Sequence, residues 1–356
     1  MRKPSNTCES ETEVTTRPLL GITMGDPTGV GAELTAMVVA RGGIQTMCRP
    51  LVIGDLATMK AAVEIVGVSL DLVAVSQPRE AEFAEGRMNV LDLKNVELDK
   101  LVRGTVDPMG GKVAYECVKK AVDLALAGEI DAIVTGPLHK EALHKAGYDY
   151  AGHTEILSDA CNTPDVTMML TSAHLRVSHV STHVSLREAI DRVKKDRIVR
   201  VIRLTDEALR RMGIQSPSIG VAGLNPHASD GGLFGNEERL EIEPAVREAR
   251  AMGLDVTGPV PPDALFYRAV RGSEIGRTTF DAVVAMYHDQ GHIPIKLLGL
   301  LDGVNVTLGL PIIRTSVDHG TAFGKAGKGT ANPTSLVEAI KLAVAMANGR
   351  NKQKAS

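Results

Sequence analysis

Three histidines end apolar, strand-like segments of the sequence, where imidazole groups can bind a divalent metal ion. His183 ends LRVSHVSTH, His227 follows SIGVAGLNP, and His288 follows AVVAMY. In open α/β sheets the carboxyl ends of the strands line the ligand crevice, so three such imidazoles can converge on one ion. Their separations of 44 and 61 residues match no local zinc signature, and scattered histidines remain the alternative. We expect surface or core positions without a site role for His139, His144, His174 and His179.

Two further groups of polar residues could bind the anionic or hydroxyl groups of a substrate. His153 and Thr154 of GHTE precede a helical pattern, although Thr154 could simply cap that helix. Lys296 lies in GHIPIK, with Asn305 and Arg314 further along the chain. Lys and Arg near a metal suit a phosphorylated or carboxylated substrate, and the alternative is that both are surface charges.

Two aspartates and two glycine-rich segments complete the candidates. Asp263 and Asp289 could orient a histidine or carry a proton, and Asp263 could instead cap a helix. GDPTGVGAE (25–33) is either an anion site at a helix N-terminus or a tight turn, and it matches neither dinucleotide nor P-loop fingerprints. VDHGTAFGKAGKGTANP (317–333) suits close approach to a flat ligand, or is a flexible connection.

Apolar runs alternate with helical patterns along the chain, which predicts an α/β protein. Continuous runs such as LLGITM, PLVIG and DAIVTGP suit parallel strands covered on both faces. The clearest helical pattern spans 110–128, and others cover 30–41, 55–66, 194–212, 236–251 and the segment after Pro333. We expect a disordered tail (1–17), one lobe from 18–140 with 300–356, and a second from 141–299.

Composition excludes several classes of protein. The 356 residues carry 40 basic and 43 acidic side chains, a net charge of −3, so no global positive field would hold nucleic acid or an anionic membrane. No apolar run is long enough for a membrane span, and the first residues lack a secretory signal. The four cysteines form no C-x-x-C pair. These features predict a soluble, cytoplasmic protein.

Eight segments together resemble the 4-hydroxythreonine-4-phosphate dehydrogenase family of vitamin B6 biosynthesis. They are GDPTGVGAE, TGPLHKEAL, GHTEIL, STHVSL, GLNPHASDGG, GPVPPDALF, YHDQGHIPIK and GVNVTLGLPIIRTSVDHGTA. The match runs in order from Leu19 to the C-terminal helix. It implies a two-lobed α/β fold like that of isocitrate and isopropylmalate dehydrogenases, with parallel and mixed sheets and an active site in the cleft between the lobes. It also implies a homodimer with active sites at the subunit interface.

The resemblance implies roles for individual residues. The metal ligands are His183, His227 and His288, holding zinc or else cobalt, manganese or magnesium. The substrate residues are His153, Thr154, Lys296, Asn305 and Arg314. The last glycine-rich segment is similar to the nicotinamide-adenine loop of isopropylmalate dehydrogenases, which implies binding of NAD, or of NADP, by His319, Gly320, Thr321, Gly327 and Asn332.

The implied reaction is oxidation of the secondary hydroxyl of 4-hydroxythreonine 4-phosphate, or a similar 4-phospho-hydroxy acid, followed by decarboxylation of the β-keto acid. Gly324, followed by Lys325, stands where an acidic cofactor contact is expected. GHIPIKLLG resembles a sister group that converts D-threonate or D-erythronate 4-phosphate to dihydroxyacetone phosphate, and related members oxidise a terephthalate cis-diol. Two alternatives of other classes are a three-histidine zinc hydrolase and a catalytically silent ligand-binding protein.

Overall fold

The computed structural model describes residues 17–275, 279–299 and 301–355, so the tail predicted at 1–17 lies outside the described residues except for Arg17. The backbone carbonyl of Arg17 accepts a hydrogen bond of 2.9 Å from Arg49 Nε. This contact fixes the start of the described chain beside the second strand.

Twelve strands form one mixed sheet, in the order β3-β4-β2-β1-β5-β12-β11-β6-β7-β10-β8-β9. The strands are β1 (Leu19–Thr23), β2 (Arg49–Gly54), β3 (Asp71–Val75), β4 (Arg87–Asp92), β5 (Ala132–Thr135), β6 (Thr167–Thr171), β7 (Arg176–His179), β8 (Ser218–Ala222), β9 (Asp255–Val260), β10 (Ala282–Ala285), β11 (Val304–Leu308) and β12 (Arg314–Val317). The pairs β12-β11, β11-β6 and β6-β7 are antiparallel, and the other pairs are parallel. The predicted α/β class with parallel and mixed pairing is confirmed. That both groups of strands join one continuous sheet was not predicted.

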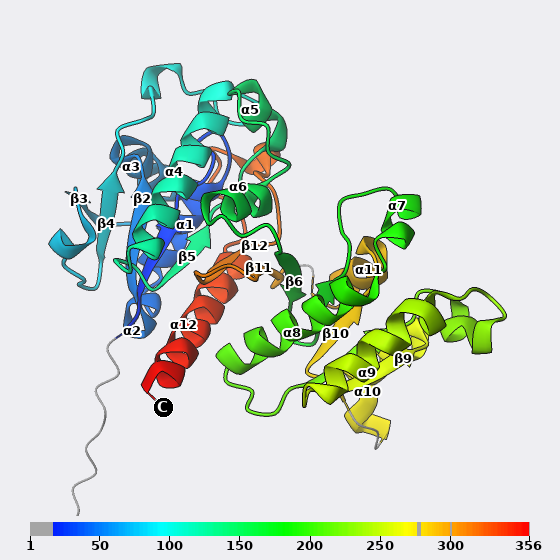
Figure 1. Ribbon diagram of the computed structural model, residues 1–356. Coiled ribbons are helices and arrows are strands. Elements are labelled where there is room, and N and C mark those ends of the chain that lie inside the picture. The colour runs from blue at the N-terminus through cyan, green and yellow to red at the C-terminus, as the bar shows by residue number, and fades with distance from the viewer. Residues whose placement is uncertain (1–16, 276–278, 300, 356) are drawn as a thin grey trace, which may run out of the picture.

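The helices lie along both faces of this sheet (Figure 1). They are α1 (Gly31–Ala40), α2 (Ile44–Met47), α3 (Leu56–Val66), α4 (Pro108–Leu126), α5 (Lys140–Lys145), α6 (His153–Ala160), α7 (Leu186–Asp191), α8 (Lys195–Arg211), α9 (Glu243–Ala251), α10 (Pro262–Arg271), α11 (His288–Leu298) and α12 (Thr334–Ala355). Buried apolar side chains of α1, α8, α9 and α12 belong to one continuous core. Smaller cores lie under α4 to α6 and under α10 and α11.

Local sequence explains where the main helices begin and end. Asp55 caps α3 by accepting a hydrogen bond from Thr58 N (2.7 Å), and Gly67 ends it with a left-handed φ of 71°. Asp107 caps α4 in the same way, with Pro108 in its first turn. The helix predicted at 236–251 is a π-helical turn at Glu238–Ile242 that continues into α9.

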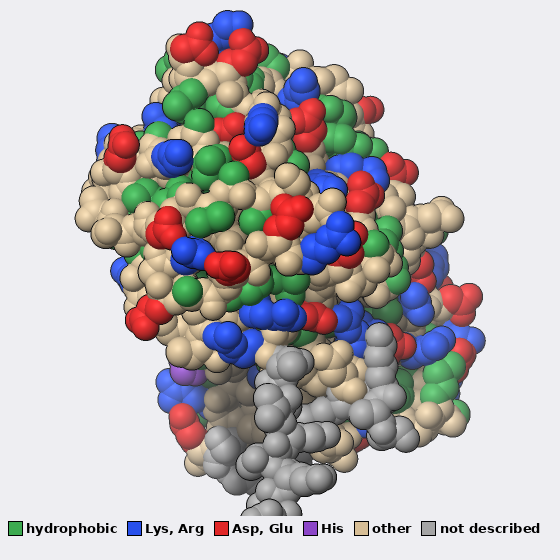
Figure 2. Space-filling model, turned by 90° about the vertical axis from the view of Figure 1, so that its left-hand side faces the viewer, with side chains coloured by type: hydrophobic (Ala, Val, Ile, Leu, Met, Phe, Trp, Pro, Cys, Tyr) green, Lys and Arg blue, Asp and Glu red, His purple; other side chains and the backbone are tan. Residues whose placement is uncertain are grey.

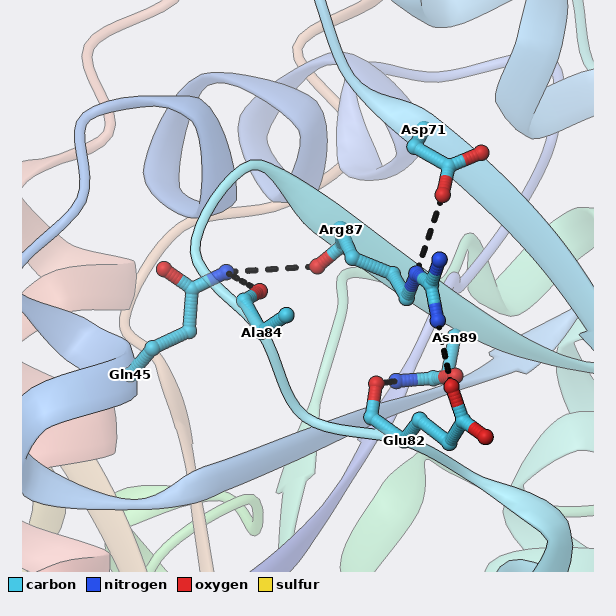
Figure 3. Close-up of polar contacts among 6 residues, drawn as sticks. All are labelled: Gln45, Asp71, Glu82, Ala84, Arg87 and Asn89. Atoms are coloured by element: carbon cyan, nitrogen blue, oxygen red, sulfur yellow. Dashed lines mark hydrogen bonds and ion pairs between the residues drawn. The ribbon is translucent and has the colours of Figure 1, made fainter.

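The β3 edge of the sheet is held by polar contacts (Figure 3). Arg87 pairs with Asp71 (2.9 Å) and Glu82 (2.7 Å), and Gln45 donates to the carbonyl of Arg87 (3.2 Å). Asn89 donates to the carbonyl of Glu82 (3.0 Å). These contacts stabilise the β3 edge of the sheet. Within the described part of the chain, no helix is long and apolar enough to span a membrane.

Candidate active site

A cavity of about 340 Å³ gathers many of the predicted site residues. Its lining includes, from the predicted set, His153, Thr154, His183, Asn305, Arg314, His319 and Gly320. These residues come from α6, β11, β12 and the loops that follow β7 and β12. Segments almost 170 residues apart in sequence, from His153 to Gly320, thus meet at one cavity.

Strand geometry explains why β11 and β12 supply three polar side chains to this cavity. Asn305 is paired directly with Ser316, and Arg314 lies two residues before Ser316 on the same strand. Alternate residues of a strand, and directly opposed residues of a pair, share one face of the sheet. Asn305, Arg314 and Ser316 therefore project together, and all three line the cavity.

Arg314 is a buried cation at the cavity wall, only 2% exposed. Its Nε and Nη2 donate to Thr135 Oγ1 (3.2 and 2.7 Å), and its Nη1 donates to Thr307 Oγ1 (3.0 Å). Among the described residues no carboxylate forms an ion pair with it. Burial lowers the pKa of Arg314 to about 9, and the charge of Glu155 opposes this shift. A guanidinium in this position favours an anionic ligand, because its charge is otherwise uncompensated.

His153, the first residue of α6, lies beside this cation. Burial, and then the charge of Arg314, hold the pKa of His153 well below its ordinary value, so the ring is neutral. The Nε2 atom of His153 and the Oδ1 atom of Asn305 are buried without hydrogen-bond partners in the described structure. Buried polar atoms in proteins are nearly always paired. A polar ligand in the cavity would satisfy both.

Lys296 reaches the same region from α11. Its Nζ forms an ion pair with the carboxylate of Asp318 and donates to the carbonyl of Asp318 (3.2 Å). Asp318 lines the cavity and directly precedes His319 and Gly320. The predicted substrate lysine is therefore adjacent to the cavity through Asp318, whose role the sequence did not indicate.

A second, larger cavity of about 740 Å³ adjoins the first. The two share Thr154, Glu155, Met168 and His183 in their linings. The larger cavity extends toward the cations Arg192, Lys194 and Arg197. Buried polar atoms without hydrogen-bond partners line both cavities, His153 Nε2 and Asn305 Oδ1 in the smaller one and His179 Nε2 and Ser181 Oγ in the larger one. The buried guanidinium of Arg314 favours the smaller cavity as the substrate site.

Two of the three predicted metal histidines approach each other. The ring centroids of His183 and His288 are 5.7 Å apart, and Asp289 Oδ1 contacts His288 Nδ1 (2.7 Å). Burial, followed by the charges of Lys140 and His288, lowers the pKa of His183, which favours the neutral imidazole that binds metals. Within the described residues of one chain, no three His, Cys, Asp or Glu side chains are close enough to hold an ion. Three histidine side chains are suitable ligands for a divalent metal, but the described residues of one chain do not bring all three together.

His227 lies apart, in a loop of unusual backbone geometry. The residues 227–231 all have positive φ, from 47° to 73°. Left-handed conformations cost free energy for non-glycine residues and cluster at functional sites. Glu238, 1% exposed, accepts hydrogen bonds from Leu224 N (2.8 Å) and Asn225 N (2.7 Å) and so holds the segment between β8 and this loop.

The remaining predicted residues occupy other positions. Asp263 is exposed in the first turn of α10. Asn332 Oδ1 accepts from Thr334 N (2.9 Å) at the start of α12, and the carbonyl of buried Thr321 accepts from Val30 N (3.1 Å). Gly327 donates its N–H to Glu33 (2.6 Å). These three residues of the glycine-rich segment therefore make internal contacts, whereas His319 and Gly320 face the cavity.

Sequence reasoning missed several residues of the cavity. Lys140 of TGPLHKEAL and Glu155 of GHTE line it, as does Asp318, although each lies within a segment already singled out. Thr135 and Thr307 are the hydroxyl partners of Arg314. Both threonines also lie within singled-out segments, TGPLHKEAL and GVNVTLGLPIIRTSVDHGTA, but their contact with Arg314 depends on strand pairing.

The chain is thus an α/β protein with one mixed sheet and a cavity whose buried guanidinium favours an anionic ligand. Residues 46–343 match the family described as pyridoxal phosphate biosynthetic protein PdxA, and the chain belongs to this family. It is 48% identical over 334 residues to D-threonate 4-phosphate dehydrogenase of Cupriavidus necator, covering 94% of this chain and 98% of the relative. It is 45% identical over 332 residues to 4-hydroxythreonine-4-phosphate dehydrogenase of Desulforapulum autotrophicum, covering 93% and 96%.

A solved structure shows the same fold. The crystal structure of a 4-hydroxythreonine-4-phosphate dehydrogenase from Burkholderia phymatum superposes with a TM-score of 0.81 at 47% identity, covering 93% of this chain and 98% of that one. The family and the dehydrogenase class predicted from the sequence are confirmed.

Proposed function

We propose that this enzyme oxidises and decarboxylates a four-carbon 4-phospho-hydroxy acid with NAD, and that D-threonate 4-phosphate is its preferred substrate. The identity to the Cupriavidus necator enzyme and the segment GHIPIKLLG support this choice. A second candidate is 4-hydroxythreonine 4-phosphate, supported by the 45% identity to the Desulforapulum autotrophicum enzyme. The hydrolase and silent-binder alternatives lose support because the relatives are dehydrogenases.

The observation that carries the proposal is buried Arg314 at the wall of the cavity of about 340 Å³. The three hydroxyl contacts orient the guanidinium but do not neutralise it. A phosphate or carboxylate would supply the missing charge and could accept a hydrogen bond from His153 Nε2, while Asn305 Oδ1 could accept from a substrate hydroxyl. Thr154 and Lys296 complete the proposed substrate set.

The chemistry follows from the substrate. Transfer of hydride from C3 to NAD, with loss of the hydroxyl proton, gives a β-keto acid. Cleavage of its C1–C2 bond then releases carbon dioxide, and protonation of C2 gives dihydroxyacetone phosphate. Arg314 would hold an anionic end so that C3 faces the cofactor. The ammonium of Lys296, kept at the cavity edge by Asp318, would bind the other anionic end. Asp263 and Asp289 stay proposed as proton carriers or partners of the histidines.

A divalent ion, zinc first, would be held by His183, His227 and His288, and when bound it polarises hydroxyl and carbonyl oxygens. His183 and His288 come together in one chain and His227 does not. We therefore include a second copy of the chain in the proposal, as the source of the missing ligand at a homodimer interface. Exposed apolar side chains on and just after α11, the helix that His288 begins, suit such an interface; they are Ile293, Leu297 and Leu301.

The cofactor in this proposal binds the segment 319–332, with His319 and Gly320 nearest the substrate cavity. Residues 18–140 with 300–356 form one lobe and 141–299 the other, and the cavity draws residues from both. Nucleic acid is not a proposed partner: on the face in Figure 2 basic and acidic side chains are interspersed. The proposed compartment is the cytoplasm, in line with three described cysteines that are free thiols.

The test is a comparison of catalytic efficiencies. Purified enzyme is assayed for NAD reduction with D-threonate 4-phosphate, D-erythronate 4-phosphate and 4-hydroxythreonine 4-phosphate. We expect kcat/KM for D-threonate 4-phosphate to exceed the others by about tenfold or more. A preference for 4-hydroxythreonine 4-phosphate would move the enzyme to the second candidate function.

A further inference from the structure

The segment GDPTGVGAE has a structural use that the proposed reaction leaves unexplained. It forms the turn between β1 and α1, where an anion site was one expectation. Asp26 Oδ1 instead accepts from Thr28 N (2.9 Å) and Thr28 Oγ1 (2.6 Å), and Val30 N donates to the carbonyl of Thr321 (3.1 Å). The N–H and O–H donors of Thr28 and Val30 are thus used within the chain and not by an external anion. The segment is a tight turn packed against the glycine-rich loop.

Glu33, in the first turn of α1, makes the most specific contact of this segment. Its side chain is 2% exposed. Oε1 accepts from Gly327 N (2.6 Å) and Oε2 accepts from Gly329 N (2.8 Å). One buried carboxylate therefore joins two backbone N–H groups almost 300 residues away in sequence. Hydrogen bonds to an ionised acceptor are shorter and stronger than neutral ones.

The two glycines are required by this geometry. Both have left-handed φ, 76° at Gly327 and 63° at Gly329. A Cβ at Gly329 would lie 2.9 Å from the carbonyl oxygen of Ile65. The turn that presents both N–H groups to Glu33 therefore excludes side chains at these positions.

The same loop reaches the substrate cavity at its other end. His319 and Gly320 line the cavity, and Thr321 lies against Gly29, whose added Cβ would approach Thr321 Cβ to 2.8 Å. The bonds from Val30 and to Glu33 thus fix the loop at two points on α1 and its preceding turn. The position of residues 319 and 320 at the cavity depends on this anchorage.

We propose that Glu33 is the positioning residue of the cofactor loop: its carboxylate sets residues 319–332 in the conformation that receives NAD. This inference rests on the proposed function, in which that loop binds the cofactor. Glu33 is too deeply buried to contact NAD itself, and it acts through the backbone of Gly327 and Gly329. Losing this contact should weaken cofactor binding without changing substrate binding.

The test uses Glu33→Gln in the full, metal-loaded enzyme. The glutamine keeps one acceptor oxygen but turns an amide NH₂ toward the other backbone N–H. We expect KM for NAD to rise about tenfold, with KM for D-threonate 4-phosphate and kcat within about twofold of wild type. Hydrogen exchange of the peptide that covers 319–332, measured without cofactor, should become faster.

Asp92→Asn is the matched control, because Asp92 Oδ1 also accepts two backbone N–H groups, from Leu56 (3.0 Å) and Lys94 (3.2 Å), at the end of β4. It should leave the exchange of 319–332 and the KM for NAD at wild-type values. Where Glu33→Gln does not fold, Glu33→Asp, which retains the charge but is one methylene shorter, should raise the KM for NAD in the same direction.

Two results would overturn the inference in distinguishable ways. Unchanged exchange of 319–332 in Glu33→Gln would mean that Glu33 does not hold the loop. Faster exchange with unchanged KM for NAD would mean that the loop is held by Glu33 but does not bind the cofactor, which would also remove the proposed cofactor site.

Discussion

Replacing Arg314 with methionine removes the guanidinium and keeps a long apolar side chain in its place. Three of its N–H donors already bind Thr135 and Thr307, which leaves about two for a substrate anion. Charged hydrogen bonds contribute about 1.5–3 kcal/mol each, so two make about 3–6 kcal/mol. The expected loss in kcat/KM for D-threonate 4-phosphate is therefore roughly 10²–10⁴-fold.

The assay measures NAD reduction by wild type and Arg314→Met with D-threonate 4-phosphate and with unphosphorylated D-threonate. This double-mutant style cycle shows whether Arg314 contacts the phosphate or the carboxylate of the substrate. If Arg314 binds the phosphate, the variant loses most of its activity on the phosphorylated compound and much less on the other.

Thr307→Val is the matched control, because it removes one partner of Arg314 and leaves the charge in the cavity. We expect less than about a tenfold loss from it. Equal losses of Arg314→Met on both compounds would refute the phosphate contact, and wild-type kinetics would refute the anion site itself.

Three further predictions concern other parts of the molecule. Chelation should abolish turnover, and adding zinc, cobalt or manganese should restore it. His227→Ala should lower the amount of bound metal found by elemental analysis. Full activity of the metal-free enzyme would contradict a role of the metal in the reaction. Gly320→Val should raise KM for NAD by about tenfold with unchanged metal content. An added Cβ meets no protein atom within 4 Å, so the valine side chain would occupy the open space beside the cavity in which the proposal places NAD. Unchanged cofactor kinetics would place NAD elsewhere. Burial raises the pKa of Asp26 above 3.8, so ionisation of this carboxyl lowers the stability of the fold as pH rises from about 3.8 through the raised pKa. The gain in Tm of Asp26→Asn over wild type should therefore be larger at about pH 7 than at about pH 4. An equal gain at both pH values would contradict a destabilising buried charge.

Much of the fold follows from local sequence, because apolar runs and helical periodicity report burial directly. The pattern at 110–128 became α4 at Pro108–Leu126, and that at 194–212 became α8 at Lys195–Arg211. The single sheet could not be predicted in this way. It depends on the antiparallel pairing of β11 with β6, between segments more than 130 residues apart, and nothing in either segment names its partner.

The residues of the candidate site also differ in how far local sequence could predict them. Motif position and the family resemblance led to Asn305 and Arg314, and the pairing of β11 with β12 places them on one face of the sheet. Glu33 and Asp318 escaped notice because their partners are distant in sequence and their roles are set by packing. The assembly of the metal ligands stays a prediction, since the proposal takes one of them from a second copy of the chain.

Product analysis tests the central claim most directly. Purified enzyme is incubated with D-threonate 4-phosphate, NAD and a divalent metal, and NADH, carbon dioxide and dihydroxyacetone phosphate are each quantified. All three products should form in equal amounts, because each hydride transfer produces a β-keto acid that decarboxylates. NADH without carbon dioxide would contradict the decarboxylating mechanism, and release of inorganic phosphate without NADH would contradict dehydrogenase chemistry on this substrate.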